Sequence, residues 1–303
     1  MSSTRLLAGL LVALLVAACG SGAPAATSSP EPSAGEATLY PLIVSSQQVV
    51  GENRFLFALL TRDGNRPVSA PDRTASVAFV PPGSTTASDP VEGTFLWAVE
   101  DERGLYVLRT TFETPGTWTA VFITTAPGTT EERLAMTFDV AEEGFAVAVG
   151  EPAPASDTPT ADDVGGDLDR LTTDTSPDPR FYTTSVADAL SANEPFVLVF
   201  ATPAFCQTAQ CGPTLDHVKE LSADYPDATF INVEPYQLEF TEGRLQPVLD
   251  ANNRLQAVPS VLDWGITTEP WVYVVDAEGV VRGSFEGVFS DDELRDALDA
   301  VVS

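Results

Sequence analysis

Two cysteines stand five positions apart directly after a continuous apolar run, and this arrangement restricts the folds open to the chain. Cys206 and Cys211 lie in the stretch FVLVFATPAFCQTAQCGPTLDHV, which begins at residue 196. The run at 196–201 is typical of a strand that is covered on both faces, and an amphipathic stretch follows at 214–224. We therefore expect the cysteine pair between a buried strand and a helix, where folds that combine both elements place their chemistry.

The third cysteine of the chain, Cys19, closes an N-terminal segment that has the layout of a secretory signal. Within residues 1–19, one early arginine precedes an apolar run that is too short for a membrane span. The stretch VAAC at 16–19 resembles the bacterial lipobox, which implies that Cys19 is lipidated and becomes the first residue of the mature protein. A plain signal peptide is the alternative. We expect a lipid-anchored protein on the extracytoplasmic side of the cell membrane, where disulfides persist.

The charge of the chain excludes several classes of partner. The formal net charge is -29, which argues against nucleic acid and against electrostatic binding to anionic lipid headgroups. We expect the lipid at Cys19 to be the contact with the membrane, and we expect no nucleic-acid partner.

Composition divides the rest of the chain into further segments. Residues 20–36 are small, polar and proline-bearing, and are expected to form a flexible tether. Residues 37–149 contain seven strand-like runs separated by turn signals, which predicts an immunoglobulin-like β-sandwich. Three aromatic residues in it, Trp97, Tyr106 and Trp118, are expected on strand faces and in the core. The runs are LYPLIVSSQQVV, RFLFALLT, RTASVAFVP, TFLWAVE, GLYVLRTTF, TWTAVFITT and RLAMTFDV.

Residues 150–180 are rich in Pro, Asp, Thr and Gly, which predicts an acidic linker. A calcium loop is the alternative, but the regular aspartate spacing of such a loop is missing. Residues 181–303 then alternate between helical and strand-like patterns, with a helix expected at 241–255 that Pro247 interrupts and a hairpin at 271–287. A serine and a glutamate three residues apart, Ser290 and Glu293, predict a capping box for the last helix.

Residues 181–303 resemble a thioredoxin-fold domain. Four stretches carry the resemblance: the strand and cysteine in FVLVFATPAFC, the helix start with Pro213, the segment TEPW at 268–271, and the closing hairpin YVVDAEGVVRGSFEG. The resemblance implies that Pro270 follows a cis peptide bond and that its neighbour's backbone can pair with an incoming peptide. The expected fold class is therefore two domains, an all-β immunoglobulin-like sandwich followed by an α/β thioredoxin-like domain.

The spacing of the pair differs from that of thioredoxins, which have two residues between the cysteines. The four residues present here resemble the spacing of the Q-type peroxiredoxins, yet Thr202 lies one position further from Cys206 than in that family. Copper-delivering Sco-type proteins use two cysteines and a distant histidine. Here the single histidine, His217, is six residues after Cys211 and points away from it on a helix, while the loop before residue 271 offers Glu269.

Helix geometry constrains the pair further. Residues five apart on a continuous helix have Cα atoms roughly 8 to 9 Å apart, whereas a disulfide needs less than about 7 Å. Either residues 206–211 form a loop, with Gly212 as the cap and Pro213 at the first helical position, or the first helical turn unwinds on oxidation. The sequence leaves both arrangements open.

These observations predict thiol-disulfide exchange with protein partners. Cys206, near the positive end of the following helix, is expected to attack, and the deeper Cys211 to resolve the mixed disulfide. A peroxidase of the peroxiredoxin type is the less favoured enzyme. The alternatives are a binding or scaffold lipoprotein with a structural disulfide, and a copper(I)-handling protein. No cofactor and no metal are assigned from the sequence.

Overall fold

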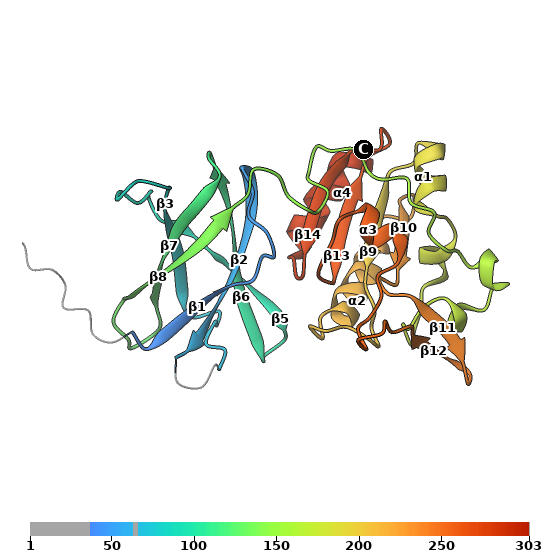
Figure 1. Ribbon diagram of the computed structural model, residues 1–303, viewed down its shortest axis with the longest axis horizontal. Coiled ribbons are helices and arrows are strands. Elements are labelled where there is room, and N and C mark those ends of the chain that lie inside the picture. Colours follow the sequence, from blue (N-terminus) through green and yellow to red (C-terminus); the bar gives the residue numbers. More distant parts are fainter. Residues whose placement is uncertain (1–36, 63–65, 303) are drawn as a thin grey trace, which may run out of the picture. The chain divides into compact units, whose positions relative to one another are not determined.

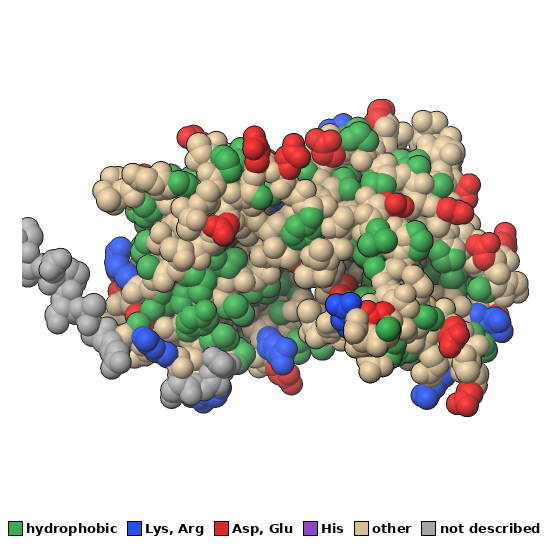
Figure 2. Space-filling model, viewed as in Figure 1, with side chains coloured by type: hydrophobic (Ala, Val, Ile, Leu, Met, Phe, Trp, Pro, Cys, Tyr) green, Lys and Arg blue, Asp and Glu red, His purple; other side chains and the backbone are tan. Residues whose placement is uncertain are grey.

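A computed structural model describes residues 37–62 and 66–302. The expected signal segment, the lipobox with Cys19 and the tether at 20–36 lie outside these residues. Within the described residues, no helix combines the length and the apolar character needed to cross a membrane. Figure 2 shows Asp and Glu side chains recurring across the visible face, in keeping with the acidic composition.

The N-terminal half consists of two four-stranded sheets, and all of their strand pairs are antiparallel (Figure 1). In the first sheet the order is β1, β2, β6, β5; in the second it is β4, β3, β7, β8. The strands are β1 (Leu39–Ile43), β2 (Gly51–Thr61), β3 (Thr74–Val80), β4 (Val91–Glu92), β5 (Thr94–Val99), β6 (Arg103–Phe112), β7 (Gly116–Thr125) and β8 (Glu132–Val140). Each of the seven predicted runs overlaps one of these strands, and the two-residue β4 is additional.

An aromatic core joins these two sheets. Phe55 and Phe57 of β2 lie 5.2 Å, between ring centroids, from Phe79 of β3 and Phe122 of β7 respectively. The four rings are buried because alternate residues of each strand point to the same face. Edge-to-face aromatic pairs add about 0.5–1.5 kcal/mol each beyond the burial of their surface. The two sheets therefore form a sandwich, as the strand pattern predicts.

The three aromatic residues singled out in this half lie on strands. Tyr106 and Trp118 are buried in the sandwich, whereas Trp97 is 38% exposed and its ring packs against Phe95. The Trp118 indole donates to the carbonyl of Thr114, and burial raises the pKa of Tyr106. Their expected roles as core and strand-face residues are confirmed.

The C-terminal half is built on a mixed sheet with the order β10, β9, β13, β14. Strand β9 runs parallel to β10 and antiparallel to β13, which pairs antiparallel with β14. A separate hairpin contains β11 and β12. The elements are α1 (Val186–Ala192), β9 (Phe196–Phe200), α2 (Cys211–Ser222), β10 (Thr229–Val233), β11 (Leu238–Thr241), β12 (Arg244–Pro247), α3 (Pro259–Asp263), β13 (Trp271–Val275), β14 (Val281–Glu286) and α4 (Asp291–Val302).

Strand β9 is buried along its whole length, and its two faces belong to different cores. Val197 and Val199 pack in a cluster with side chains of α2 and α4. Phe196, Leu198 and Phe200 pack in a second cluster on the opposite face, with side chains of α1 and α3. The continuous apolar run therefore predicts the covering of both faces correctly, and it fixes the point at which the chain leaves the sheet toward the cysteines.

The structure corrects the expected fold class. The described residues are 37% strand and 17% helix, arranged in small sheets with few helices, so this part of the chain is mainly β and the expected α/β thioredoxin-like domain is not supported. One cause is the segment at 241–255, which is not the helix expected there. Glu242 and Gly243 have positive φ angles of 53° and 79°, and this turn connects β11 to β12. Helix-breaking Pro247 ends β12.

The segment at 150–180, assigned to a linker on its composition, packs against the C-terminal half. It contains the short 3-10 helices η1 (Asp162–Val164), η2 (Leu168–Arg170) and the start of η3 (Pro179–Tyr182). Leu168 and Leu171 contact the core beside β9, and Asp174 forms an ion pair of 2.6 Å with Lys219 of α2. Leucines and threonines scattered through a polar sequence supply these contacts, so the acidic composition alone misjudges how ordered the segment is.

Candidate functional site

Cys206 lies in the loop between β9 and α2, and Cys211 is the first residue of α2. A disulfide joins them, with their Cα atoms 5.9 Å apart. The loop turns back at Ala209, whose φ of 63° is uncommon for a residue with a side chain. Of the two arrangements left open by the sequence, the structure has the loop. The helix, however, begins at Cys211 with Gln210 at its N-cap, ahead of the predicted start.

The two cysteines differ sharply in exposure. Cys206 is half-buried, while Cys211 is completely buried and belongs to the cluster that covers one face of β9. Leu215 and Val218, on the same face of α2 as Cys211, pack in that cluster. A reagent from solvent therefore reaches the sulfur of Cys206 first.

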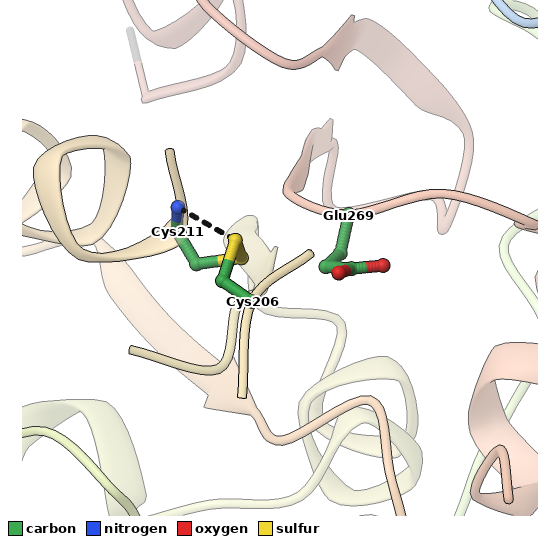
Figure 3. A group of neighbouring side chains, drawn as sticks. All are labelled: Cys206, Cys211 and Glu269. Carbon is green, nitrogen blue, oxygen red and sulfur yellow. Dashed lines mark hydrogen bonds between the residues drawn. A yellow bond between two sulfur atoms is a disulfide. The ribbon is translucent and has the colours of Figure 1, made fainter. Parts of the chain in front are cut away.

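Helix α2 directs its N-terminal end at Cys206. The backbone N–H of Cys211 donates to the Cys206 sulfur at 3.2 Å, as Figure 3 shows, and the Thr208 hydroxyl lies 3.4 Å from the same sulfur. The first turn of α2 contains no acidic side chain that would oppose a negative charge at this end. The N–H of Cys211 and the dipole of α2 both favour a thiolate at Cys206 when the disulfide is reduced.

Glu269 brings a carboxylate to the pair from a different part of the chain. It directly precedes Pro270, after which β13 begins, and the peptide bond between Glu269 and Pro270 is cis, as the resemblance to thioredoxins implies. Its side chain is buried at 6% exposure. One carboxylate oxygen and the sulfurs of Cys206 and Cys211 all lie within 4.8 Å of one another (Figure 3). The site thus combines two sulfurs and one carboxylate.

Two hydrogen bonds hold that carboxylate in place. The backbone N–H of Gln207 donates to Oε1 at 2.9 Å, and the Tyr236 hydroxyl donates to Oε2 at 2.7 Å. The Gln207 side-chain amide in turn donates to the Tyr236 oxygen at 2.9 Å. Burial, and then the bond to Glu269, raise the pKa of Tyr236 to about 12, so the hydroxyl keeps its proton and remains a donor. The three residues form a closed ring beside the disulfide.

The backbone next to the cis bond is also engaged. The carbonyl of Glu269 accepts a hydrogen bond from the Thr208 hydroxyl at 3.2 Å, and the carbonyl of Pro270 accepts one from the N–H of Gly287 at 2.9 Å. The resemblance to thioredoxins implies that the backbone of the proline's neighbour is available to a peptide. In this state its carbonyl already has a partner, the hydroxyl beside Cys206.

A buried glutamate is linked by hydrogen bonds to the loop that carries Cys206. Glu234, which follows β10, accepts hydrogen bonds from the Thr173 N–H at 2.6 Å and the Thr173 hydroxyl at 2.7 Å. The same hydroxyl oxygen accepts from the N–H of Ala204, two residues before Cys206. Burial raises the pKa of Glu234. The segment expected to be a linker thus contacts the loop that carries Cys206.

His217 lies away from the pair, as helix periodicity predicts. Its Nε2 is 2.7 Å from a carboxylate oxygen of Asp291 at the start of α4, and its ring stacks on Phe289. It is therefore not positioned to join the two cysteines in the arrangement of a Sco-type copper site.

The structure brings together three of the residues named from the sequence, Cys206, Cys211 and Pro270, whereas Cys19 lies outside the described residues. Sequence reasoning noted Glu269 only for not being a histidine, and it missed Tyr236. The signal available in the sequence was the position of Glu269 and Tyr236 along the chain. Glu269 lies just before β13 and Tyr236 shortly after β10, and both strand ends lie at the edge of the sheet where β9 leads into the cysteine loop. Their contact across 33 residues has no signature in local spacing.

Comparison with known proteins gives little. No family model and no curated protein matches the chain. A DUF4426 family protein from Pseudomonas aeruginosa PAO1 is 7% identical with a TM-score of 0.26, covering 35% of this chain and 91% of that one. A putative glycoside hydrolase from Bacteroides vulgatus ATCC 8482 is 13% identical with a TM-score of 0.23, covering 70% of this chain and 35% of that one. At these scores neither likeness supports a conclusion about the fold or the function of this chain.

Proposed function

We propose that the Cys206–Cys211 pair carries out thiol-disulfide exchange with other proteins, with Cys206 attacking and Cys211 resolving. The observation that carries this proposal is the inequality of the two sulfurs. Cys206 is half-buried and accepts an N–H from the helix terminus, whereas Cys211 is fully buried in the core. Exchange requires one accessible sulfur with thiolate character and one sheltered sulfur close behind it.

The reaction balances in two steps. In the reduced protein the Cys206 thiolate attacks one sulfur of a substrate disulfide, which forms a mixed disulfide and releases the first substrate thiolate. Cys211, having lost its proton, then attacks the Cys206 sulfur and releases the second substrate thiolate. The two electrons pass to the substrate, the released thiolates take up protons, and the protein returns to the disulfide state. The reverse sequence oxidises a substrate dithiol.

The neighbours of the pair set its reactivity in opposite directions. The N–H of Cys211 and the hydroxyl of Thr208 stabilise a negative Cys206 sulfur, while the Glu269 carboxylate, within 4.8 Å, disfavours it. Glu269 thus restrains the thiolate, which favours the disulfide over the reduced pair. This balance supports a reversible couple of intermediate potential rather than a strong oxidant.

The proposal places the reaction outside the cytoplasmic membrane, with the protein held there by lipid on Cys19. The support is the sequence of residues 1–19, with its apolar run and small residues before the cysteine. Metabolic labelling with an alkyne fatty acid tests the anchor in the native host. We expect label on the wild-type chain and none on Cys19→Ser; equal labelling of the two would contradict the anchor.

Glutathione disulfide provides a defined test of the exchange chemistry. Cys211→Ser, reduced and then exposed to glutathione disulfide, is expected to retain one glutathione on Cys206, because the resolving thiol is missing. Cys206→Ser is the matched control, in which buried Cys211 should react at least tenfold more slowly. Intact-mass measurement reads both, and circular dichroism checks that each variant is folded.

A structural disulfide in a non-enzymatic binding or scaffold protein is the second candidate, and the complete burial of Cys211 in the core favours it. The two candidates differ in the wild-type protein. Exchange predicts repeated turnover of a small disulfide substrate in the presence of a dithiol reductant. A structural bond predicts no turnover above that of the Cys206→Ser/Cys211→Ser variant.

A further inference from the structure

We propose that the reduced site binds a divalent zinc ion through the sulfurs of Cys206 and Cys211 and the carboxylate of Glu269. This goes beyond the exchange reaction and holds whether or not the pair turns over. In the described part of the chain, these three form the group of metal-ligating side chains whose ligand atoms converge, each lying within 4.8 Å of the others. The oxidised sulfurs are bonded to each other, so binding is confined to the reduced state.

The distances suit a tetrahedral ion after a small adjustment. Zinc binds thiolate at about 2.3 Å and carboxylate oxygen at about 2.0–2.2 Å, which places two sulfur ligands about 3.8 Å apart. Opening the disulfide lets the sulfurs separate toward this spacing, because Cys206 lies in a loop and can shift away from Cys211. The carboxylate oxygen, at most 4.8 Å from each sulfur, is then close enough to share the same ion.

The carboxylate is already oriented as a ligand. Gln207 and Tyr236 each donate a hydrogen bond to one oxygen of Glu269, and every carboxylate oxygen has a further lone pair for an ion. Outer hydrogen bonds of this kind fix the orientation of ligating side chains, and their loss typically costs 10–100-fold in affinity. Because Cys206 is only half-buried, solvent can supply the fourth ligand.

The ligand set selects the class of metal. Two thiolates exclude magnesium and calcium, which take oxygen ligands, and a carboxylate oxygen is a poor partner for copper(I), which prefers sulfur alone. Zinc accepts both kinds of ligand and keeps an open position when three protein groups bind it. The assignment to zinc therefore depends on Glu269, and this distinguishes it from a copper(I) site formed by the cysteines alone.

The site then connects metal binding to redox state. A dithiol reductant transfers two electrons and two protons to the disulfide and itself becomes a disulfide. Zinc next displaces the two thiol protons to solvent and occupies both sulfurs. While zinc is bound, Cys206 cannot attack a disulfide substrate, so zinc is expected to inhibit thiol-disulfide exchange. Oxidation of the pair to the disulfide is expected to release the zinc.

Spectroscopic titration with Co²⁺ tests the site in the full chain. We expect the reduced protein to bind one Co²⁺ with a thiolate-to-cobalt charge-transfer band that equimolar Zn²⁺ abolishes, and the oxidised protein to give no band. Glu269→Gln should weaken binding at least tenfold. Glu278→Gln, which changes an exposed glutamate in the turn after β13, is the matched control and should bind as the wild type does.

Two results of the cobalt titration would overturn the proposal. One is the absence of a thiolate band in the reduced wild type, and the other is unchanged affinity in a folded Glu269→Gln, which would leave a site of two thiolates suited to copper(I). Protection supplies a readout that needs no variant: Zn²⁺ should slow alkylation of the reduced wild-type thiols at least tenfold, and unchanged alkylation contradicts the site. The glutathione reaction, run without metal, reports on exchange separately.

Discussion

Reduction of the disulfide is expected to lower the free energy of unfolding by about 2 kcal/mol. The bond closes a loop of only residues 206–211. In the chain-entropy model the closed loop removes about 2.1 + 1.5R ln n cal/mol/K from the unfolded chain, and n of about 6 gives about 7.4 cal/mol/K, or about 2.2 kcal/mol at 25 °C. The reduced Cys211 stays in the core as a small apolar side chain and adds little further cost.

By linkage, folding favours the closed bond by the same amount, about 2.2 kcal/mol, which corresponds to about 47 mV for a two-electron couple. A bond that closes a 100-residue loop would gain about 4.7 kcal/mol by the same expression. The short loop therefore leaves the bond open to exchange by other thiols. This is the energetic condition that the proposed function needs.

Guanidinium unfolding of the oxidised and dithiol-reduced protein measures the difference, with the fluorescence of buried Trp264 and Trp271 reporting on the C-terminal half. The Cys206→Ser/Cys211→Ser variant is the control, since its stability should be insensitive to reductant. A loss above about 4 kcal/mol would refute the reasoning, because it would mean that the disulfide holds the core of this half together.

Three further outcomes are expected. Glu293 pairs with Arg54 at 2.7 Å; burial alone would raise its pKa, but the hydrogen bond from Arg54 keeps the pKa below the ordinary 4.5. The contribution of Glu293 to folding stability is therefore present above pH 4.5 and is lost as the pH falls. Arg54→Ala should lower the free energy of unfolding by about 3–5 kcal/mol at pH 7, as measured by urea unfolding. Burial raises the pKa of Glu234, so its contribution to folding stability is full below pH 4.5 and is lost as the pH rises. Glu234→Gln should remove this decline from the curve of stability against pH; a variant that still shows the wild-type decline above pH 4.5 would contradict the assignment. Glu269→Gln should make reduced Cys206 react faster with an alkylating reagent at pH 7, because the replacement removes a carboxylate within 4.8 Å of the sulfur; an unchanged rate in the folded variant would contradict this role of Glu269.

Patterns that depend on neighbours along the chain predicted much of the structure. Alternating apolar residues located the strands of the sandwich, and the run at 196–201 located a strand buried on both faces. The pairing of Cys206 with Cys211 also agrees with the sequence, and the cis bond before Pro270 agrees with what the resemblance to thioredoxins implies. The strands are determined by local interactions or by the period of a strand.

Features set by tertiary contacts were beyond this reasoning. The segment at 241–255 has helix-like spacing, but the turn at Glu242 and its pairing with the preceding strand make it a hairpin. The expected α/β class failed with it, since the described residues contain far more strand than helix. Glu269 reaches the cysteines only because the buried strands β9 and β13 lie side by side, a pairing that no single stretch of sequence records.

The reduction potential of the Cys206–Cys211 couple tests the central claim most directly. Equilibration of the protein with glutathione buffers, read by thiol alkylation and mass, gives the potential without assuming a substrate. A reversible exchange site predicts a value above about -250 mV, in the range of proteins that turn over their disulfides. A value below about -300 mV, where structural disulfides resist the glutathione pool, would contradict exchange as the function of this pair.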